Sequence, residues 1–204
     1  MKSIKGKILV AFSLIISLCI ILGAFNIYSS NKSLVHSKDI IKHELPVLID
    51  EEQLLNNLAQ RSALARGYIL FGDESNKERF LKYTEESKVI QEDLLALSDS
   101  DKMEELIQKS VDWRTIIIDR VFTQYDQGNE ERAKEILKDE VAPISNELMD
   151  GFRELASERE KSIVASGEIV IASGESVKTT SIIISHHRPS ACACNSQYYY
   201  KTSP

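Results

Sequence analysis

Arginine is the residue type in this sequence with the clearest capacity to bind a ligand. Its guanidinium presents a planar fork of donors that a carboxylate can meet at two points. Several arginines and one tyrosine fall on or beside the predicted buried helix faces, toward the end far from the N-terminus. Pairing with a nearby Asp or Glu, or extension into solvent, is the alternative for each. The candidate ligand-binding residues are Arg61, Arg66, Tyr68, Arg114 and Arg120.

No other set of residues predicts catalysis or a metal site. His36 and His43 are seven positions apart, but no nucleophile or carboxylate motif accompanies them, so we expect surface residues. The C-terminal histidines and cysteines are possible zinc ligands, but their Cys-x-Cys spacing is shorter than in structural zinc motifs. We therefore expect no enzyme activity, no cofactor and no metal. These four residues are His186, His187, Cys192 and Cys194.

The element that must position the candidate residues begins with a long apolar run. Residues 8–31 carry no charge and follow Lys2, Lys5 and Lys7. As a helix this segment reaches roughly 36 Å, enough to cross the hydrocarbon core of a bilayer. A cleaved signal peptide is the alternative, but its apolar core is shorter and ends in a small-x-small site. We favour an uncleaved transmembrane helix over residues 8–30.

The lysines before the apolar run also predict the orientation of the chain. Positive charge stays on the cytoplasmic side of a membrane. Residues 1–7 are then cytoplasmic, and the remaining chain lies in the extracellular space or the periplasm. We expect a single-pass protein of the cell membrane, in contact with lipid through this one helix.

Composition narrows the class of the remaining chain. After residue 31 it carries 22 basic and 31 acidic groups, a net charge of −9, which repels phosphate backbones and argues against nucleic acid as a partner. Glycine and proline number only eight and four in 204 residues, which favours long helices. The chain between Cys19 and Cys192 has no cysteine, which excludes a disulfide framework there.

Apolar periodicity predicts four helices after the membrane segment. The first continues from the anchor to about residue 66, with Pro46 expected to bend or loosen it. Gly67 and Gly72 bracket the first turn, and the polar run 98–101 and Gly128 mark the other two. This gives further helices over 75–97, 101–127 and about 50 residues from Glu130. The predicted inner stripe of the first helix is Ile27, Leu34, Ile41, Leu45, Leu48, Leu55, Ala59 and Ser62; that of the third is Met103, Leu106, Ser110, Trp113, Ile117, Val121 and Tyr125.

These helices predict an all-α fold, in which an N-terminal transmembrane helix continues into an antiparallel up-down-up-down four-helix bundle. We assign the bundle to residues 31–180. Residues 181–204 change composition abruptly, and we interpret them as an aberrant, disordered tail that follows a shifted frame or an early stop. A second membrane span is expected to begin near Ile182, but the apolar run ends after three isoleucines.

Several stretches resemble the N-terminal part of a bacterial methyl-accepting chemotaxis protein, with its four-helix-bundle sensor. They are the lysine-flanked anchor, ELPVLIDEEQLL at 44–55, ALARGYILFGDESNKERFLKY at 63–83, the Pro143-centred fourth helix and KTTSIII at 178–184. The element Arg66-Gly67-Tyr68 followed by Gly72-Asp73 also resembles helical sensors of histidine kinases and cyclases. No local motif matches a defined ligand pocket of these families.

The resemblance implies a sensory, ligand-binding module of a membrane chemoreceptor that signals for chemotaxis as a homodimer, here without the cytoplasmic signalling part. Its ligand would be a small molecule or a ligand-loaded binding protein. Two alternatives remain: the sensor of a histidine kinase or cyclase, and a stand-alone membrane-tethered helical binding protein. Glutamate pairs such as Glu51-Glu52 are not expected to be methylation sites, because methylation in this family is cytoplasmic. We expect them on solvated faces or as charge at helix N-termini.

Overall fold

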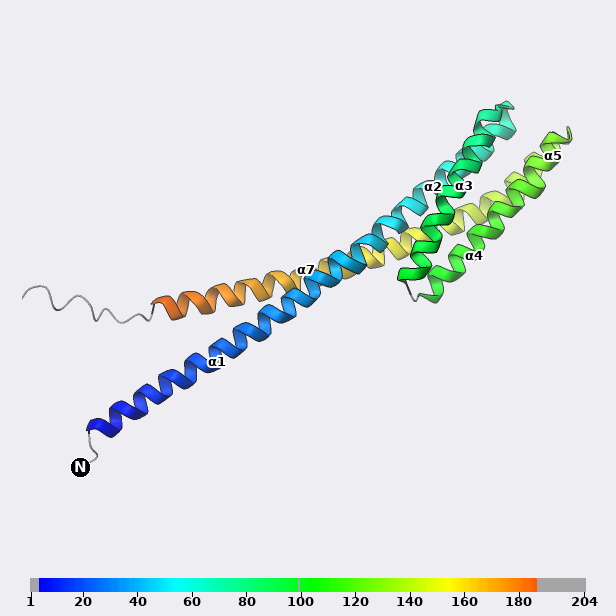
Figure 1. Cartoon of the computed structure of the whole chain (residues 1–204). Helices are drawn as coiled ribbons and strands as arrows, with labels where there is room; N and C mark the ends of the chain where they lie inside the picture. Colours follow the sequence, from blue (N-terminus) through cyan, green and yellow to red (C-terminus); the bar gives the residue numbers. More distant parts are fainter. Residues whose placement is uncertain (1–3, 99, 187–204) are drawn as a thin grey trace, which may run out of the picture. The chain divides into compact units, whose positions relative to one another are not determined.

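A computed structural model describes residues 4–98 and 100–186 of the chain, with side chains up to residue 179 (Figure 1). The α-helices are α1 (Ile4–Asp39), α2 (Leu45–Phe71), α3 (Glu74–Leu97), α4 (Asp101–Ile116), α5 (Thr123–Asp126), α6 (Glu130–Ile136) and α7 (Ala142–His186). Wider π-helical turns connect some of them: η1 (Ile40–Glu44), η2 (Ile117–Phe122) and η3 (Leu137–Val141). No strand occurs among the described residues, which confirms the all-α class.

The turns at 98–101 and Gly128 fall where the sequence predicts them. The first turn is shorter than predicted, because α2 continues through Gly67 to Phe71 and ends at Gly72. Gly72 and Gly128 have φ of 67° and 82°, the left-handed conformation that glycine adopts without strain at a helix end. Asp73 then caps α3 by accepting a hydrogen bond from the Ser75 backbone N–H at 3.0 Å. Ser100 caps α4 in the same way, accepting from Met103 N–H.

Contacts between helices show the relative direction of α4 and α7 within residues 38–166. The Lys102 ammonium on α4 lies 2.9 Å from Glu154 on α7, and Lys109, further along α4, pairs with Glu147. The residue number falls along α7 as it rises along α4, so the two helices are antiparallel. At Gly151 on α7 an added Cβ would lie 2.6 Å from a methyl group of Leu106, so α4 and α7 approach closely there.

The core follows the predicted stripe on α4 and its continuation, where all the predicted residues except the half-buried Tyr125 are buried. The stripe predicted for the first helix is only partly confirmed: Leu55 packs half-buried against the core, but most of the other members are exposed. Ile41 and Leu45 are 65% and 41% exposed, and Ser62 is its only fully buried member. This helix has apolar residues on two faces, and periodicity alone selected the wrong one. The residues of α2 that enter the core instead are Val47, Leu54, Leu58, Leu64, Ala65, Tyr68 and Ile69.

Pro46 and Pro143 each follow a π-helical turn. Proline has no N–H to donate, and its ring collides with the carbonyl four residues earlier in a regular helix. In η1 the Leu45 N–H donates instead to the carbonyl of Ile40, and in η3 the Ala142 N–H donates to Leu137. These turns widen the helix just before each proline, which is the local loosening expected at Pro46.

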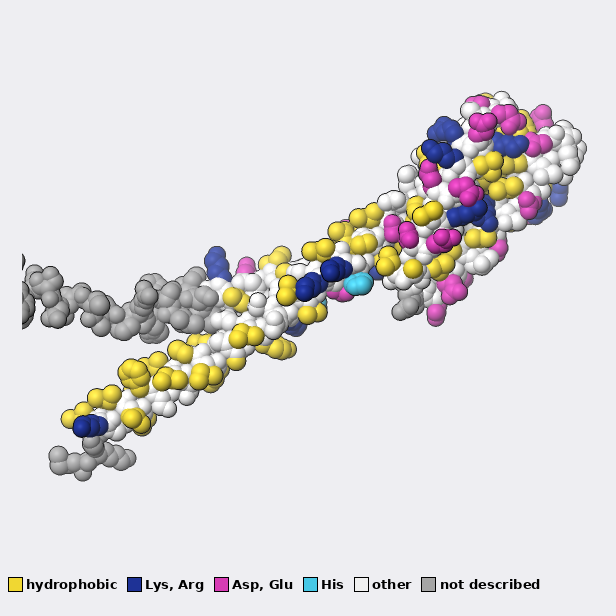
Figure 2. All heavy atoms as spheres, viewed as in Figure 1, with side chains coloured by type: hydrophobic (Ala, Val, Ile, Leu, Met, Phe, Trp, Pro, Cys, Tyr) yellow, Lys and Arg dark blue, Asp and Glu magenta, His cyan; other side chains and the backbone are white. Residues whose placement is uncertain are grey.

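The described chain divides into two compact units, one of residues 4–37 with 167–186 and one of residues 38–166. The first unit contains most of α1, whose apolar side chains are exposed, as Figure 2 shows. Its apolar stretch, with mean hydropathy 2.9, is long enough to cross a membrane, and no other described helix meets that test. Residues 181–186 continue α7 as helix, and the rest of the expected tail, 187–204, lies outside the described residues.

Candidate ligand-binding site

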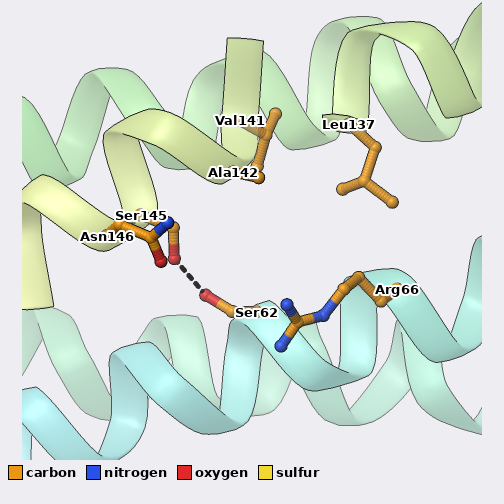
Figure 3. Close-up of a pocket in the computed structure, with 7 residues that line it drawn as sticks. All are labelled: Ser62, Arg66, Leu137, Val141, Ala142, Ser145 and Asn146. Carbon is orange, nitrogen blue, oxygen red and sulfur yellow. Dashed lines mark hydrogen bonds between the residues drawn. The ribbon is translucent and has the colours of Figure 1, made fainter. Parts of the chain in front are cut away.

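A polar groove lies between α2 and the start of α7, within the 38–166 unit. The Ser62 hydroxyl of α2 and the Ser145 hydroxyl of α7 are 2.6 Å apart and hydrogen-bonded, and both residues are buried. Side chains this small let the two helices approach, and a hydroxyl can donate or accept. Figure 3 shows the pair facing each other across the groove.

Arg66 and Asn146 complete the polar part of the groove. Arg66 stands one helical turn beyond Ser62 on α2, and Asn146 follows Ser145 on α7 (Figure 3). Leu137, Val141 and Ala142 from η3 and the start of α7 form the apolar wall. The space measures about 80 Å³. A guanidinium, two hydroxyls and an amide around a space of this size suit a small anionic group.

Arg61 lies in the bundle core on another face of α2. It is only 1% exposed, and its Cζ stands 5.2 Å from the centroid of the Trp113 ring. Burial, together with the nearby positive charge of Arg114, lowers the pKa of Arg61 to about 10. Its Nε and Nη2 and the Trp113 Nε1 are buried and find no acceptor among the described residues.

Tyr68, another candidate residue, has two carboxylate partners. The Tyr68 hydroxyl is placed to donate to Asp126 or Glu74, and the Lys77 ammonium lies 2.6 Å from Asp126. Burial and these two carboxylates raise the pKa of Tyr68. These contacts fasten α2 and α3 to α5.

Arg120 and Arg114 lie on the third helical segment. Arg120 of η2 makes a two-point contact with Glu140 of η3, with Nη2 to Oε1 at 2.7 Å. Arg114 is half-buried and contributes positive charge near Arg61. The structure therefore brings Arg61 and Arg114 into electrostatic contact and places Arg66 at the groove, while Tyr68 and Arg120 connect helices.

An ionic cluster absent from the sequence-based candidates, with one buried and two half-buried members, ties α2 and η1 to α7. Arg159 Nε donates to both carboxylate oxygens of Glu51 at 3.0 Å, and its Nη1 donates to Glu44 at 3.0 Å. The Glu51 side chain is 0% exposed, so its expected place on a solvated face is wrong. Burial raises the pKa of Glu51, and the charge and hydrogen bonds of Arg159 oppose that rise.

The possible metal ligands of the sequence are not brought together where the structure describes them. His36 is half-buried and His43 exposed, and the described residues contain no cluster of His, Cys, Asp or Glu fit to hold a metal ion. His187, Cys192 and Cys194 lie outside the described residues, as does the side chain of His186.

Sequence reasoning missed Ser145, Asn146 and Trp113 as parts of a site. Ser145 and Asn146 have no special type or spacing, and Trp113 has the pattern of an ordinary core residue. Only the register between helices reveals their neighbours, and a single sequence does not encode that register. The one available signal was an arginine, Arg61, in a run of core positions on α2.

Comparison with known families agrees with the helical fold. Residues 1–162 match the model of the four helix bundle sensory module for signal transduction, the sensory module of methyl-accepting chemotaxis receptors. Neither the curated proteins nor the solved structures contain a match. The matched segment covers well over half of the chain and includes the apolar helix, the groove and the Arg61 core. The chain therefore belongs to the family of four-helix-bundle sensory modules for signal transduction.

Proposed function

We propose that this protein is the ligand-sensing module of a chemotaxis receptor, anchored in the cell membrane by α1 with its bundle in the extracellular space or the periplasm. The observation that carries the proposal is the groove between α2 and α7. These two helices are also the ones that continue beyond the bundle, α2 through η1 into α1 and α7 on to His186. A ligand between them is therefore placed to shift one against the other, and shifts of about 1–2 Å are a known class of switch.

The ligand we propose is a small carboxylic acid. Arg66 supplies the fork for the carboxylate, and Asn146 with the two serine hydroxyls supplies donors and acceptors for the rest of the molecule. A neutral apolar ligand would leave these groups without partners, which costs binding free energy.

A thermal-shift panel of small mono- and dicarboxylic acids and amino acids tests this ligand class. We expect at least one acid to raise the Tm of the full chain in detergent by several degrees at saturation. At an acid concentration one hundred times its Kd, the free energy of unfolding should increase by about 2.7 kcal/mol. Arg66→Met should weaken that acid by about 10- to 100-fold, because one charge-assisted contact is lost. Arg153→Met is the matched control, because Arg153 is exposed and its one ion-pair partner among the described residues is Asp150. If no acid in the panel raises the Tm, the proposed ligand class is contradicted.

We further propose that the module is a homodimer. Ile41, Leu45 and Ile49 are 65%, 41% and 47% exposed and follow one another at four-residue intervals along η1 and α2. A second copy that packs against this stripe would remove three large apolar side chains from water. Members of the predicted stripe of the first helix that are exposed in one chain would then be buried between the two subunits.

Cysteine cross-linking tests the dimer and its orientation. In a chain with Cys19, Cys192 and Cys194 changed to serine, Ile41→Cys should form a disulfide-linked dimer under mild oxidation. Lys82→Cys, on the exposed surface of α3, should not. Equal cross-linking of both variants would count against the stripe as the interface. In intact cells a membrane-impermeant maleimide should label Lys82→Cys. Absence of labelling would place the bundle in the cytoplasm and contradict the proposed orientation.

A further inference from the structure

The Arg61–Trp113 contact concentrates buried donors without an acceptor. Arg61 Nε, Arg61 Nη2 and Trp113 Nε1 are fully buried, and none has a hydrogen-bond partner among the described residues. Arginine and tryptophan side chains only donate, so neither can satisfy the other. Each such atom, taken out of water and left without an acceptor, is unfavourable for folding.

The positive charge of Arg61 also lacks a negatively charged partner. The Arg61 guanidinium is 1% exposed, no described carboxylate forms an ion pair with it, and the neighbouring charge that shifts its pKa is the repulsive one of Arg114. The Trp113 ring offers a favourable face to the cation, but a ring face is a weaker partner than an anion. Elsewhere in this bundle a buried charge has an opposite partner, as Glu51 has Arg159.

The polar side chains buried on α3 and α4 form hydrogen bonds with other groups, and all of them are neutral. Thr84 and Ser87 donate to backbone carbonyls one turn earlier on α3, and Gln91 donates to Ser110. None of them forms a hydrogen bond with the unpartnered donors of Arg61 or Trp113. A small anion meets both needs of this region, because it accepts hydrogen bonds and also carries the negative charge that the neutral side chains nearby lack.

We propose that the bundle core binds one small monovalent anion beside the Arg61–Trp113 contact, within reach of the unpartnered N–H groups, of the size of a halide or the carboxylate of formate or acetate. The small size follows from the full burial of both side chains, at 1% and 0% exposure. This site is separate from the groove at Arg66, because Arg61 faces α4 whereas the groove lies toward α7. Anion binding there neutralises the buried cation and stabilises the bundle independently of the sensed ligand.

Trp113 is the only tryptophan of the chain and so reports on this site alone. The experiment titrates bromide into the full chain in detergent at constant ionic strength and follows tryptophan emission. We expect a saturable loss of emission that chloride, formate or acetate reverses, while the neutral quencher acrylamide has little effect on the buried ring. Arg61→Met should weaken bromide binding at least about tenfold, and Arg153→Met should not.

The competing anion identifies the occupant. Reversal by chloride assigns a halide site, and reversal by formate or acetate alone assigns a carboxylate site; either result supports the proposal. Quenching that rises linearly without saturation, resists all three competitors or is unchanged in Arg61→Met would overturn it. Arg66→Met does not change this core, so it should leave bromide binding unaffected. The proposals for the anion site and for the ligand groove are therefore tested independently.

Discussion

Replacing Arg159 with methionine is expected to destabilise the bundle by about 3–5 kcal/mol. The substitution leaves the carboxylate of Glu51, 0% exposed, without its only close cationic partner among the described residues, and leaves the adjacent Glu44 carboxylate to repel it. Chemical denaturation of the full chain in detergent, followed by helical circular dichroism, measures the free energy of unfolding. An unchanged value would mean that the Glu51–Arg159 pair does not hold α2 to α7.

A double variant and the pH dependence separate lost charge from lost packing. Glu51→Met with Arg159→Met removes both charges at similar volume, and its stability should return close to that of the wild type. The pKa of folded Glu51 is raised above its ordinary value of 4.5 by burial, so the folded state binds more protons than the unfolded state. The contribution of Glu51 to the free energy of unfolding therefore falls as the pH rises from 4.5 through the raised pKa of the folded state. It is regained as the pH is lowered again toward 4.5.

Loss of Arg159 raises that pKa further, because its charge and hydrogen bonds are what oppose the effect of burial. The stability gap between Arg159→Met and the wild type should consequently narrow as pH falls from about 8 to about 5. A gap that stays constant over this range would assign the destabilisation to packing.

In contrast to Arg159→Met, Arg61→Met is expected to stabilise the bundle, by about 1–4 kcal/mol. Methionine fills much of the same volume beside Trp113 and removes a buried cation whose Nε and Nη2 have no acceptor among the described residues. Thermal and chemical denaturation in a buffer free of halide and small carboxylates measure the effect on unfolding. The increase in Tm should be several degrees.

The control for this gain is Arg153→Met, which removes an equal charge from the surface and should stay within about 0.5 kcal/mol of the wild type. Added chloride or acetate should stabilise the wild type and leave Arg61→Met unaffected, so that the difference between them shrinks. A less stable Arg61→Met variant in anion-free buffer would show that the arginine itself stabilises the core.

Much of the fold was predictable because its signals are local. Glycine at the left-handed ends of α2 and α5, Asp73 and Ser100 as caps, and steps of three and four along α4 each act within one or two turns of helix. The inner face of α2 was not predictable from periodicity. Ile41 and Leu45 form one apolar face and Leu54 and Leu58 another, and only packing against the other helices of the bundle decides which is buried.

The site shows the same division. Arginine was singled out as the residue type with binding capacity, but the different surroundings of Arg61, Arg66 and Arg120 depend on which residues of other helices face them. The Ser62–Ser145 and Glu51–Arg159 pairs join residues 83 and 108 positions apart. Neither pairing can be predicted from a single chain without the register that the bundle imposes.

Calorimetric titration tests most directly the claim that the α2–α7 groove is where this module senses its ligand. The titrant is the panel acid with the largest thermal shift, added to the full chain and to its Arg66→Met and Arg153→Met variants. We predict saturable binding to the wild type and to Arg153→Met, and binding about 10- to 100-fold weaker to Arg66→Met. Equal affinity for all three proteins, or no binding of any panel acid, would contradict the assignment of the groove.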